Sequence, residues 1–352
     1  MFAVVISCLT ISALLTQPLS AEEPKPKVLV TNLENPSGIA IQEGSGDVFV
    51  ASRYGVYRYK PGEKDRAKKN DLEIINSFEI QEDQQTGTYG KGPIYSIGPL
   101  GLAFMDGEHL VVGDGSRVDG DEYVRVYKIG AERAKPWQTE DQAAFTLGPI
   151  KAGEQSVKGE GNFYGVAVGA GAIFVTCNGD DTKGWVAKSV IAEGKPGELT
   201  PAIATKVATT VDAPVPVTFT ADGSQLVVGQ MGEITVEGDS LLTFYDPASG
   251  ELKKSLTTGL NDIAGLAYSP SGKLYATDFS WMDSSKGGLF ELVIGADDAS
   301  AVEAKKILSL DKPTAITFDK EGRLYLATFG TAKEGDDPEK SPGTLQSIEP
   351  GL

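Results

Sequence analysis

A short pattern of small and apolar residues recurs six times along the chain, and this repeat limits the possible folds more than any other feature of the sequence. Each copy has a small residue, an aliphatic residue, Ala or Thr, and a large apolar residue, and a turn glycine follows six to eight residues after the start. The copies start near residues 38, 101, 165, 216, 265 and 315. The third position holds Ala40, Ala103, Ala167, Thr218, Ala267 and Thr317.

The runs between these positions indicate β-strands. Each turn glycine precedes a second and a third apolar run rich in Val, Ile, Tyr and Phe, such as residues 48–51 and 56–59. Such runs, separated by Gly, Asp and Ser, are typical of strands joined by hairpins. The copies are spaced by 63, 64, 51, 49 and 50 residues, lengths that suit one blade each. We therefore predict an all-β fold, a six-bladed β-propeller of four-stranded antiparallel blades.

The two ends of the repeat array predict how the ring closes. The last copy ends after three strands, whereas residues 27–33, which precede the first copy, have the apolar alternation of a fourth strand. We predict that this N-terminal strand completes the sixth blade and removes the open sheet edges. Residues 22–352 would then form a single propeller domain.

The first 21 residues carry no charge and predict a signal peptide cleaved after Ala21, hence export to the periplasm or the extracellular space. The sequence Val5-Ile6-Ser7-Cys8 also fits a lipobox, although few residues precede it. Without the leader, Cys177 is the one cysteine, which excludes an intramolecular disulfide. No later stretch approaches the roughly 20 apolar residues of a membrane span.

The net charge of the chain limits the classes of partner that it can bind. The chain has 32 basic and 49 acidic residues, a net charge of −17. This field repels nucleic acids and anionic membranes and is compatible with cation binding. We expect a monomer that binds a small molecule or a protein at the mouth of its central channel.

A family resemblance rests on two segments. Residues 36–41, followed by residues 46–51, resemble the NHL-type propeller repeat, and residues 272–278 resemble its second strand. Similar repeats occur in six-bladed gluconolactonase-like, strictosidine-synthase-like and virginiamycin-lyase-like proteins. The resemblance implies the fold and not the reaction. A metal-binding Glu that begins the first blade of gluconolactonases is replaced here, because Asn35-Pro36 occupies that place.

Polar residues gather in the loops that enter each first strand and those that join the second strand to the third. These loops share one face of a propeller, here called the top face. Asp114, Asn178 and Asp278 each follow or end a second strand, so they could converge near the axis and bind Ca²⁺ through oxygen ligands. The alternative is that Asp and Asn beside Gly form turns with their own backbone.

Aromatic and basic residues of the top-face loops are candidate ligand contacts. We predict this role for Arg53, Tyr89, Tyr95, Arg117, Tyr164 and Trp281. The basic members would meet an anionic ligand or else lie solvated at the surface. Trp281 would line a pocket or else cap the core.

Two further residues are expected to be structural. His109 is the one histidine, and alignment of the repeats matches it to Val48 and Leu274, which predicts a place between two sheets. A single histidine excludes a three-histidine zinc site. Cys177 aligns with Ser52 and Asp278, and no basic neighbour in the sequence would activate its thiol.

These observations leave two functional hypotheses. The first is a binding scaffold of the cell envelope that uses its top-face loops, which fits the lack of catalytic machinery. The second is a hydrolase similar to gluconolactonase, in which Ca²⁺ or another divalent cation polarises a sugar lactone or ester. Fold alone does not separate them, because propellers host many activities.

Overall fold

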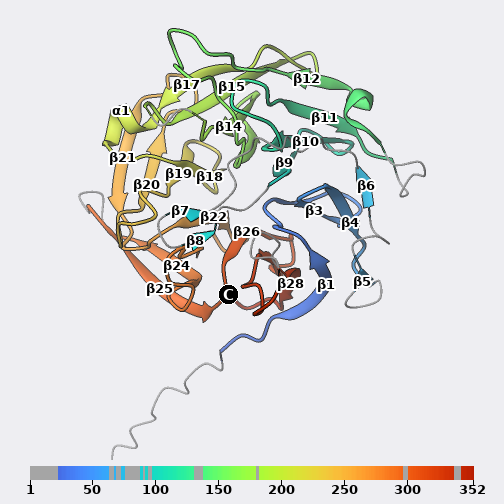
Figure 1. The fold of residues 1–352 in the computed structure, drawn as a ribbon, viewed down its shortest axis with the longest axis vertical. Coiled ribbons are helices and arrows are strands. Elements are labelled where there is room, and N and C mark those ends of the chain that lie inside the picture. The colour runs from blue at the N-terminus through green and yellow to red at the C-terminus, as the bar shows by residue number, and fades with distance from the viewer. Residues whose placement is uncertain are drawn as a thin grey trace, which may run out of the picture.

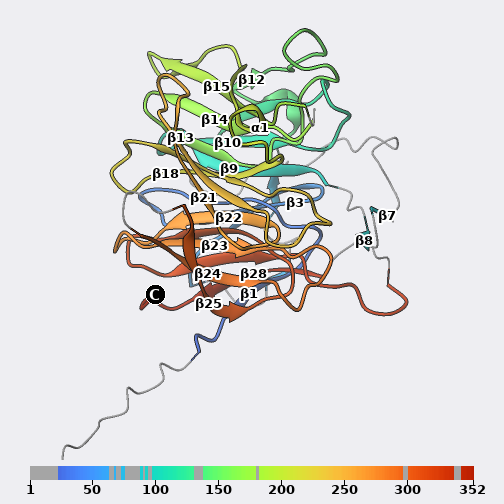
Figure 2. The same ribbon diagram turned by 90° about the vertical axis from the view of Figure 1, so that its left-hand side faces the viewer.

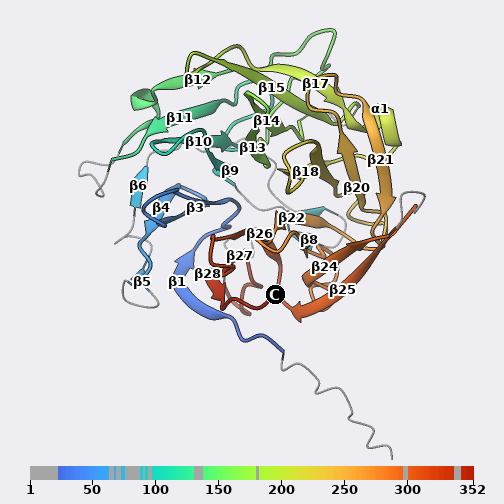
Figure 3. The same ribbon diagram turned by 180° about the vertical axis from the view of Figure 1, so that it is seen from behind.

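A computed structural model describes residues 23–62, 67–68, 73–75, 88–89, 92–93, 97–130, 138–179, 182–295, 300–336 and 342–352. Six antiparallel sheets stand around a central axis like the blades of a propeller (Figure 1). Within each blade the first strand lies innermost and the fourth lies at the rim (Figure 3). The predicted six-bladed β-propeller is confirmed.

The first three blades follow one another along the chain. Blade one contains β2 (Ile39–Ile41), β3 (Val48–Ser52), β4 (Gly55–Tyr59) and β6 (Glu73–Ile75). Blade two contains β9 (Pro99–Phe104), β10 (His109–Asp114), β11 (Val124–Lys128) and β12 (Phe145–Leu147). Blade three contains β13 (Val166–Gly169), β14 (Ala172–Thr176), β15 (Trp185–Ala192) and β17 (Thr200–Ala204), and β16 (Lys195–Pro196) extends β15 into a hairpin.

Blades four, five and six each contain four consecutive strands, except that the N-terminal strand β1 (Lys27–Leu33) supplies the fourth strand of blade six. Blade four contains β18 (Pro214–Phe219), β19 (Leu226–Gln230), β20 (Leu241–Tyr245) and β21 (Leu252–Thr257). Blade five contains β22 (Ile263–Tyr268), β23 (Leu274–Asp278), β24 (Gly288–Ile294) and β25 (Val302–Ser309). Blade six contains β26 (Pro313–Phe318), β27 (Leu324–Thr328), β28 (Gly343–Ile348) and β1 (Lys27–Leu33). Helical structure in the described residues is limited to α1 (Thr205–Thr209) and a 3₁₀ turn (Glu140–Gln142).

The N-terminal strand β1 closes the ring as the sequence predicts. It pairs antiparallel with β28, from Lys27 opposite Ser347 to Leu33 opposite Gly343. The short strand β5 (Ala67–Lys68) adds to its outer edge. A hydrogen bond of 2.7 Å from the Thr314 hydroxyl to the Pro36 carbonyl joins the inner ends of blades six and one. Both described ends of the chain are therefore held in one blade.

Close backbone packing at the axis explains why most repeats begin with glycine. A Cβ on Gly38 would lie 2.0 Å from the Leu100 carbonyl oxygen of the next blade, and a Cβ on Gly165 would lie 2.3 Å from that of Val215. Both distances are shorter than any real Cβ contact. At these two glycines the innermost strands thus approach too closely for a side chain.

The register of blade two corrects one prediction. In the hydrogen-bonded pairs, Leu110 faces Phe104 just as Val48 faces Ile41, so Leu110 and not His109 occupies the place of Val48. A shift of one residue turns a side chain to the other face of its sheet. His109 is accordingly not packed between sheets: its side chain is 23% exposed, and its Nδ1 lies 2.9 Å from Asp106 Oδ2.

The top-face loops project to one side of the ring (Figure 2). On that side, a small hairpin of β7 (Thr88–Tyr89) and β8 (Gly92–Pro93) stands clear of the blades (Figure 2). In the view along the axis, the same hairpin falls within the ring (Figure 1). The described backbone of β7 and β8 therefore lies over the channel.

Candidate functional site

A cavity of about 360 Å³ lies on the axis, where the first strands of all six blades meet. Its walls hold no charged side chain; Thr218, Tyr164, Thr317 and small residues line it, with Phe104 and Tyr268 among the larger ones. Each first strand ends the strand order of its sheet, so its inner edge has no strand partner. Backbone donors and acceptors at these edges therefore face the channel.

Asp114, a predicted metal ligand, belongs to a buried ion-pair network in blade two. Its Oδ2 accepts hydrogen bonds from Arg117 Nη1 (2.8 Å) and Arg125 Nη1 (3.0 Å), while its Oδ1 accepts from the backbone and hydroxyl of Ser116. Both arginines also contact Glu140, at 2.6 and 2.7 Å. The two positive charges compensate the two carboxylates. The network therefore has a structural role and stabilises the top of blade two.

Beside this network, carboxylates and Cys177 are buried between blades two and three. Glu122 accepts hydrogen bonds from the backbone N–H groups of Asn162 and Arg117. Burial, and then the negative charge of Asp114, hold the pKa of Glu122 well above its usual value.

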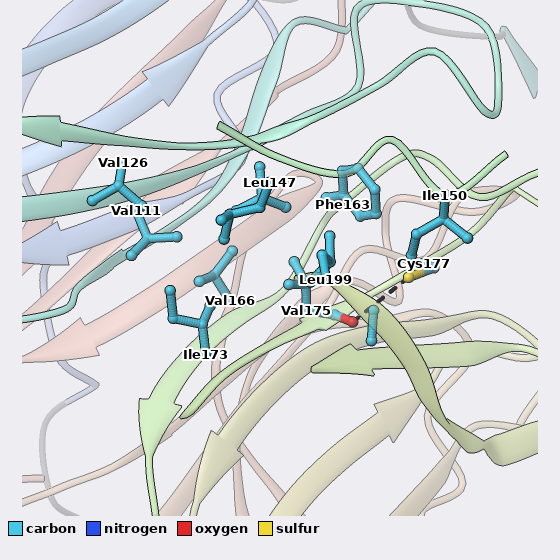
Figure 4. Close-up of a cluster of buried hydrophobic side chains, with 12 residues drawn as sticks. Val111, Val126, Leu147, Ile150, Phe163, Val166, Ile173, Val175, Cys177 and Leu199 are labelled. Atoms are coloured by element: carbon cyan, nitrogen blue, oxygen red, sulfur yellow. Dashed lines mark hydrogen bonds between the residues drawn. The ribbon is translucent and has the colours of Figure 1, made fainter. Parts of the chain in front are cut away.

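Cys177 packs among aliphatic side chains in the same region, and its Sγ lies 3.7 Å from the Val175 carbonyl (Figure 4). Burial and the nearby Glu160 raise the pKa of its thiol. Cys177 is therefore an inert packed residue and not a nucleophile.

Asp278 ends β23 and also satisfies backbone groups. Its carboxylate accepts from the N–H groups of Asn261 (3.0 Å), Asp262 (2.9 Å) and Ser280 (3.0 Å). Asp262 lies beside it with 1% exposure, and its Oδ2 accepts from the backbone N–H of Trp281 at 2.5 Å. Burial, reinforced by the charges of Asp278 and Asp239, raises the pKa of Asp262 to about 7.

Trp281 belongs to an aromatic cluster at the tops of blades five and six. Its ring packs 5.3 Å from that of Phe279, which lies edge-on to Phe329 at the same distance. Lys312, at the entry to β26, places its Nζ 5.7 Å from the centre of the Phe279 ring. Burial lowers the pKa of Lys312. Trp281 is only partly buried, so it both caps this cluster and presents an edge to solvent.

The structure places the other predicted ligand contacts in different surroundings. Tyr164 lines the axial cavity, and burial raises the pKa of its hydroxyl. Arg53 follows β3; its Nε and Nη1 are shielded from solvent and donate to no acceptor in the described part of the chain. Arg117 is held in the ion-pair network. Tyr95 and the side chain of Tyr89 lie outside the described residues.

The three predicted metal ligands do not form one group in the described structure. Asp114 is bound by arginines, Asp278 by backbone N–H groups, and the Asn178 amide nitrogen is placed to donate to the Pro214 carbonyl at 3.0 Å. Among the described residues, no three His, Cys, Asp or Glu side chains gather as a ligand set for a metal ion. The donor atoms present therefore do not fit the predicted Ca²⁺ site.

Sequence patterns gave no reason to join Asp262 to Asp239. The two residues are separated by a complete strand pair, and only the register of blades four and five brings them into electrostatic contact. Nothing in the sequence indicated that Lys312 would lie against the aromatic cluster. No described helix is long and apolar enough to cross a bilayer.

Several solved structures share this fold. A glucose dehydrogenase matches with a TM-score of 0.59 and 14% identity, over 93% of this chain and 100% of that one. The PQQ-bound aldose sugar dehydrogenase of Streptomyces coelicolor matches with a TM-score of 0.56 and 16% identity, over 92% and 96%. A putative gluconolactonase matches with a TM-score of 0.54 and 12% identity, over 93% and 92%. No protein-family model and no curated protein matches the sequence.

At these identities the likeness establishes the fold, a six-bladed β-propeller of the type found in the gluconolactonase-like structure. PQQ is a tricarboxylate, so a site for it needs uncompensated positive charge. Here Arg117 and Arg125 are neutralised by Asp114 and Glu140, whereas Arg53 Nε and Nη1 have no acceptor among the described residues. We assign this cofactor no role.

Proposed function

We propose that the protein binds a small, neutral, sugar-like molecule in the axial cavity of its central channel. One observation carries this proposal: the cavity of about 360 Å³ is walled by uncharged residues and by the inner strand edges of every blade. Its volume lies within the ~300–1,000 Å³ typical of small-molecule sites. A polyhydroxylated ligand supplies both donors and acceptors for those edges, which an apolar ligand would leave unsatisfied.

The names of the structural neighbours support the same ligand class. They include a glucose dehydrogenase and an aldose sugar dehydrogenase. Binding does not require the catalytic groups that those proteins use, so the scaffold hypothesis is the more economical one. We further propose, from the leader sequence alone, that the protein is exported and acts outside the cytoplasm.

Calorimetric titration with a panel of aldoses tests the proposal. Tyr164→Phe removes one of the two phenolic hydroxyls among the residues that line the described cavity, the other being that of Tyr268, and we expect about fivefold weaker binding from the loss of one hydrogen bond. Tyr54→Phe, which changes a top-face tyrosine outside the cavity wall, is the matched control and should bind as the parent does. Absence of aldose binding, or equal effects of the two variants, would refute the proposal.

The metal-assisted hydrolase stays the second hypothesis and makes a separate prediction. If an ion bound the native state, Ca²⁺ would raise the melting temperature and a chelator would lower it. The described donor set gives no reason to expect either shift.

A further inference from the structure

The wall of the axial cavity differs between its two ends. Each first strand begins at the top face and ends at the opposite face of the ring, here called the bottom face. At the bottom end the cavity is lined by the last residues of β2, β9, β22 and β26, which are Ile41, Phe104, Tyr268 and Phe318. We call these residues the collar. All but Ile41 are aromatic, so this end of the cavity offers ring surfaces to a bound molecule.

The collar is the accessible part of the cavity wall. Each collar residue is partly exposed. Side chains two positions apart in a strand lie on the same face of the sheet. The residues two positions before the collar are all buried, and these are Ile39, Leu102, Leu266 and Ile316. Exposure therefore increases along one face of each strand toward the bottom face, and the collar side chains can contact a molecule in the cavity.

Two rings of the collar are held by aromatic residues of the preceding blade. Phe104 makes a T-shaped contact with Phe49 of blade one, with ring centres 5.2 Å apart and ring planes at 77°. Phe318 lies 5.3 Å from Tyr275 of blade five, with the ring planes at 52°. Phe49 and Tyr275 are fully buried. Both collar rings are thus oriented before a ligand binds, which reduces the entropic cost of binding.

Tyr268 adds a hydrogen-bonding group to the collar. Burial, and then the negative charge of Asp222, raise the pKa of the Tyr268 hydroxyl to about 12. The hydroxyl is therefore protonated at neutral pH, and it can both donate to and accept from a ligand hydroxyl. None of the described residues that line the cavity is charged, which favours a neutral ligand.

We propose that the axial cavity selects a pyranose whose hydroxyl groups are equatorial, and that the C–H face of the sugar ring packs against the collar. This inference rests on the proposed function and specifies its ligand. Equatorial hydroxyls surround such a ring and can reach the inner edges of the first strands, while the axial C–H groups form an apolar face for the aromatic rings. An acyclic polyol lacks that face, and a planar aromatic ligand would leave the strand edges unsatisfied.

Calorimetric titration of the full chain with methyl β-D-glucopyranoside and with D-glucitol tests the proposal. Both molecules are neutral polyols, and only the glucoside has a rigid ring with equatorial hydroxyls. We expect the glucoside to bind about tenfold more tightly, because its ring packs on the collar and loses less conformational freedom.

Phe104→Leu removes one ring of the collar and should weaken glucoside binding about fivefold. Phe104→Tyr keeps the ring and should bind the glucoside as the parent does. Phe145→Leu is the matched control, since Phe145 is a partly exposed phenylalanine of β12 at the rim of the same blade, and it should leave binding unchanged. Phe318→Leu, with the same expected loss, serves as a second variant if Phe104→Leu fails to fold.

Three results would overturn the inference: equal binding of glucoside and glucitol, equal effects of Phe104→Leu and Phe145→Leu, or a loss in Phe104→Tyr as large as that in Phe104→Leu. If the parent binds aldoses and Tyr164→Phe weakens that binding, but the collar variants behave as the control, only the role of the collar is wrong. If the parent binds neither aldoses nor the glucoside, the proposed function is wrong and this inference with it.

Discussion

Leu33→Ala tests whether the N-terminal strand holds the ring together. Leu33 ends β1, has 0% exposure, and packs with Leu29, Val30 and Leu345 in the core shared by blades six and one. Removing a fully buried leucine side chain costs the transfer free energy of its methyl and methylene groups and adds the cost of a cavity, about 3 kcal/mol in all. Overall stabilities of proteins are ~5–15 kcal/mol, so the loss is easily measured.

The assay is urea unfolding followed by tryptophan fluorescence and by circular dichroism. Trp185 and Trp281 belong to blades three and five, far along the chain from Leu33. If closure by β1 stabilises the whole ring, their fluorescence should report the same lowered midpoint as the circular dichroism, with an unchanged slope.

Lys27→Ala is the matched control, since Lys27 begins the same strand with an exposed side chain. It should change the free energy of unfolding by less than about 0.5 kcal/mol. A Leu33→Ala loss under about 1 kcal/mol, or a tryptophan transition that stays at the parental midpoint, would show that β1 is an appendage and not the closing strand.

Two further changes probe the top face. Because the pKa of Asp262 is raised from 3.8 to about 7 in the folded state, folding binds a proton, and the free energy of unfolding should fall as pH rises between these values. The contribution of Asp262 to this fall should be a few kcal/mol, since one pKa unit corresponds to about 1.4 kcal/mol. Asp262→Asn should remove that contribution and flatten the profile; an unchanged pH profile in that variant would contradict the assignment. Arg125→Met should destabilise the protein by about 3 kcal/mol, because it leaves Asp114 and Glu140 with one arginine instead of two. Lys128→Met, at the exposed end of the same strand, is the control and should have little effect in the same urea assay.

The architecture could be predicted from the sequence because it depends on local patterns. Six copies of one strand pattern, each with its turn glycine, define six blades, and the apolar alternation of residues 27–33 supplies the strand missing from the last. Four of the six copies begin with glycine, and at Gly38 the next blade approaches too closely for a Cβ. The apolar alternation of a strand and the residues that form a turn are properties of neighbouring residues, so both can be recognised without coordinates.

Exact register was harder to predict, as His109 shows. Blade two has a short turn between its first two strands, and an alignment one residue out of register placed a partly buried histidine, 23% exposed, between two sheets. Hydrogen-bonded pairing decides which face each side chain takes.

The candidate sites depended on tertiary structure. Sequence position alone placed Asp114 and Asp278 at equivalent strand ends, yet one meets two arginines and the other meets backbone N–H groups. The meeting of Asp239 and Asp262 required the loops of two blades to pack together. Strand patterns depend on neighbours along the chain, whereas the charge, solvation and partners of a carboxylate depend on the residues that the fold brings beside it. For this reason the sequence by itself determined the propeller, and only the tertiary structure decided the surroundings of its candidate site residues.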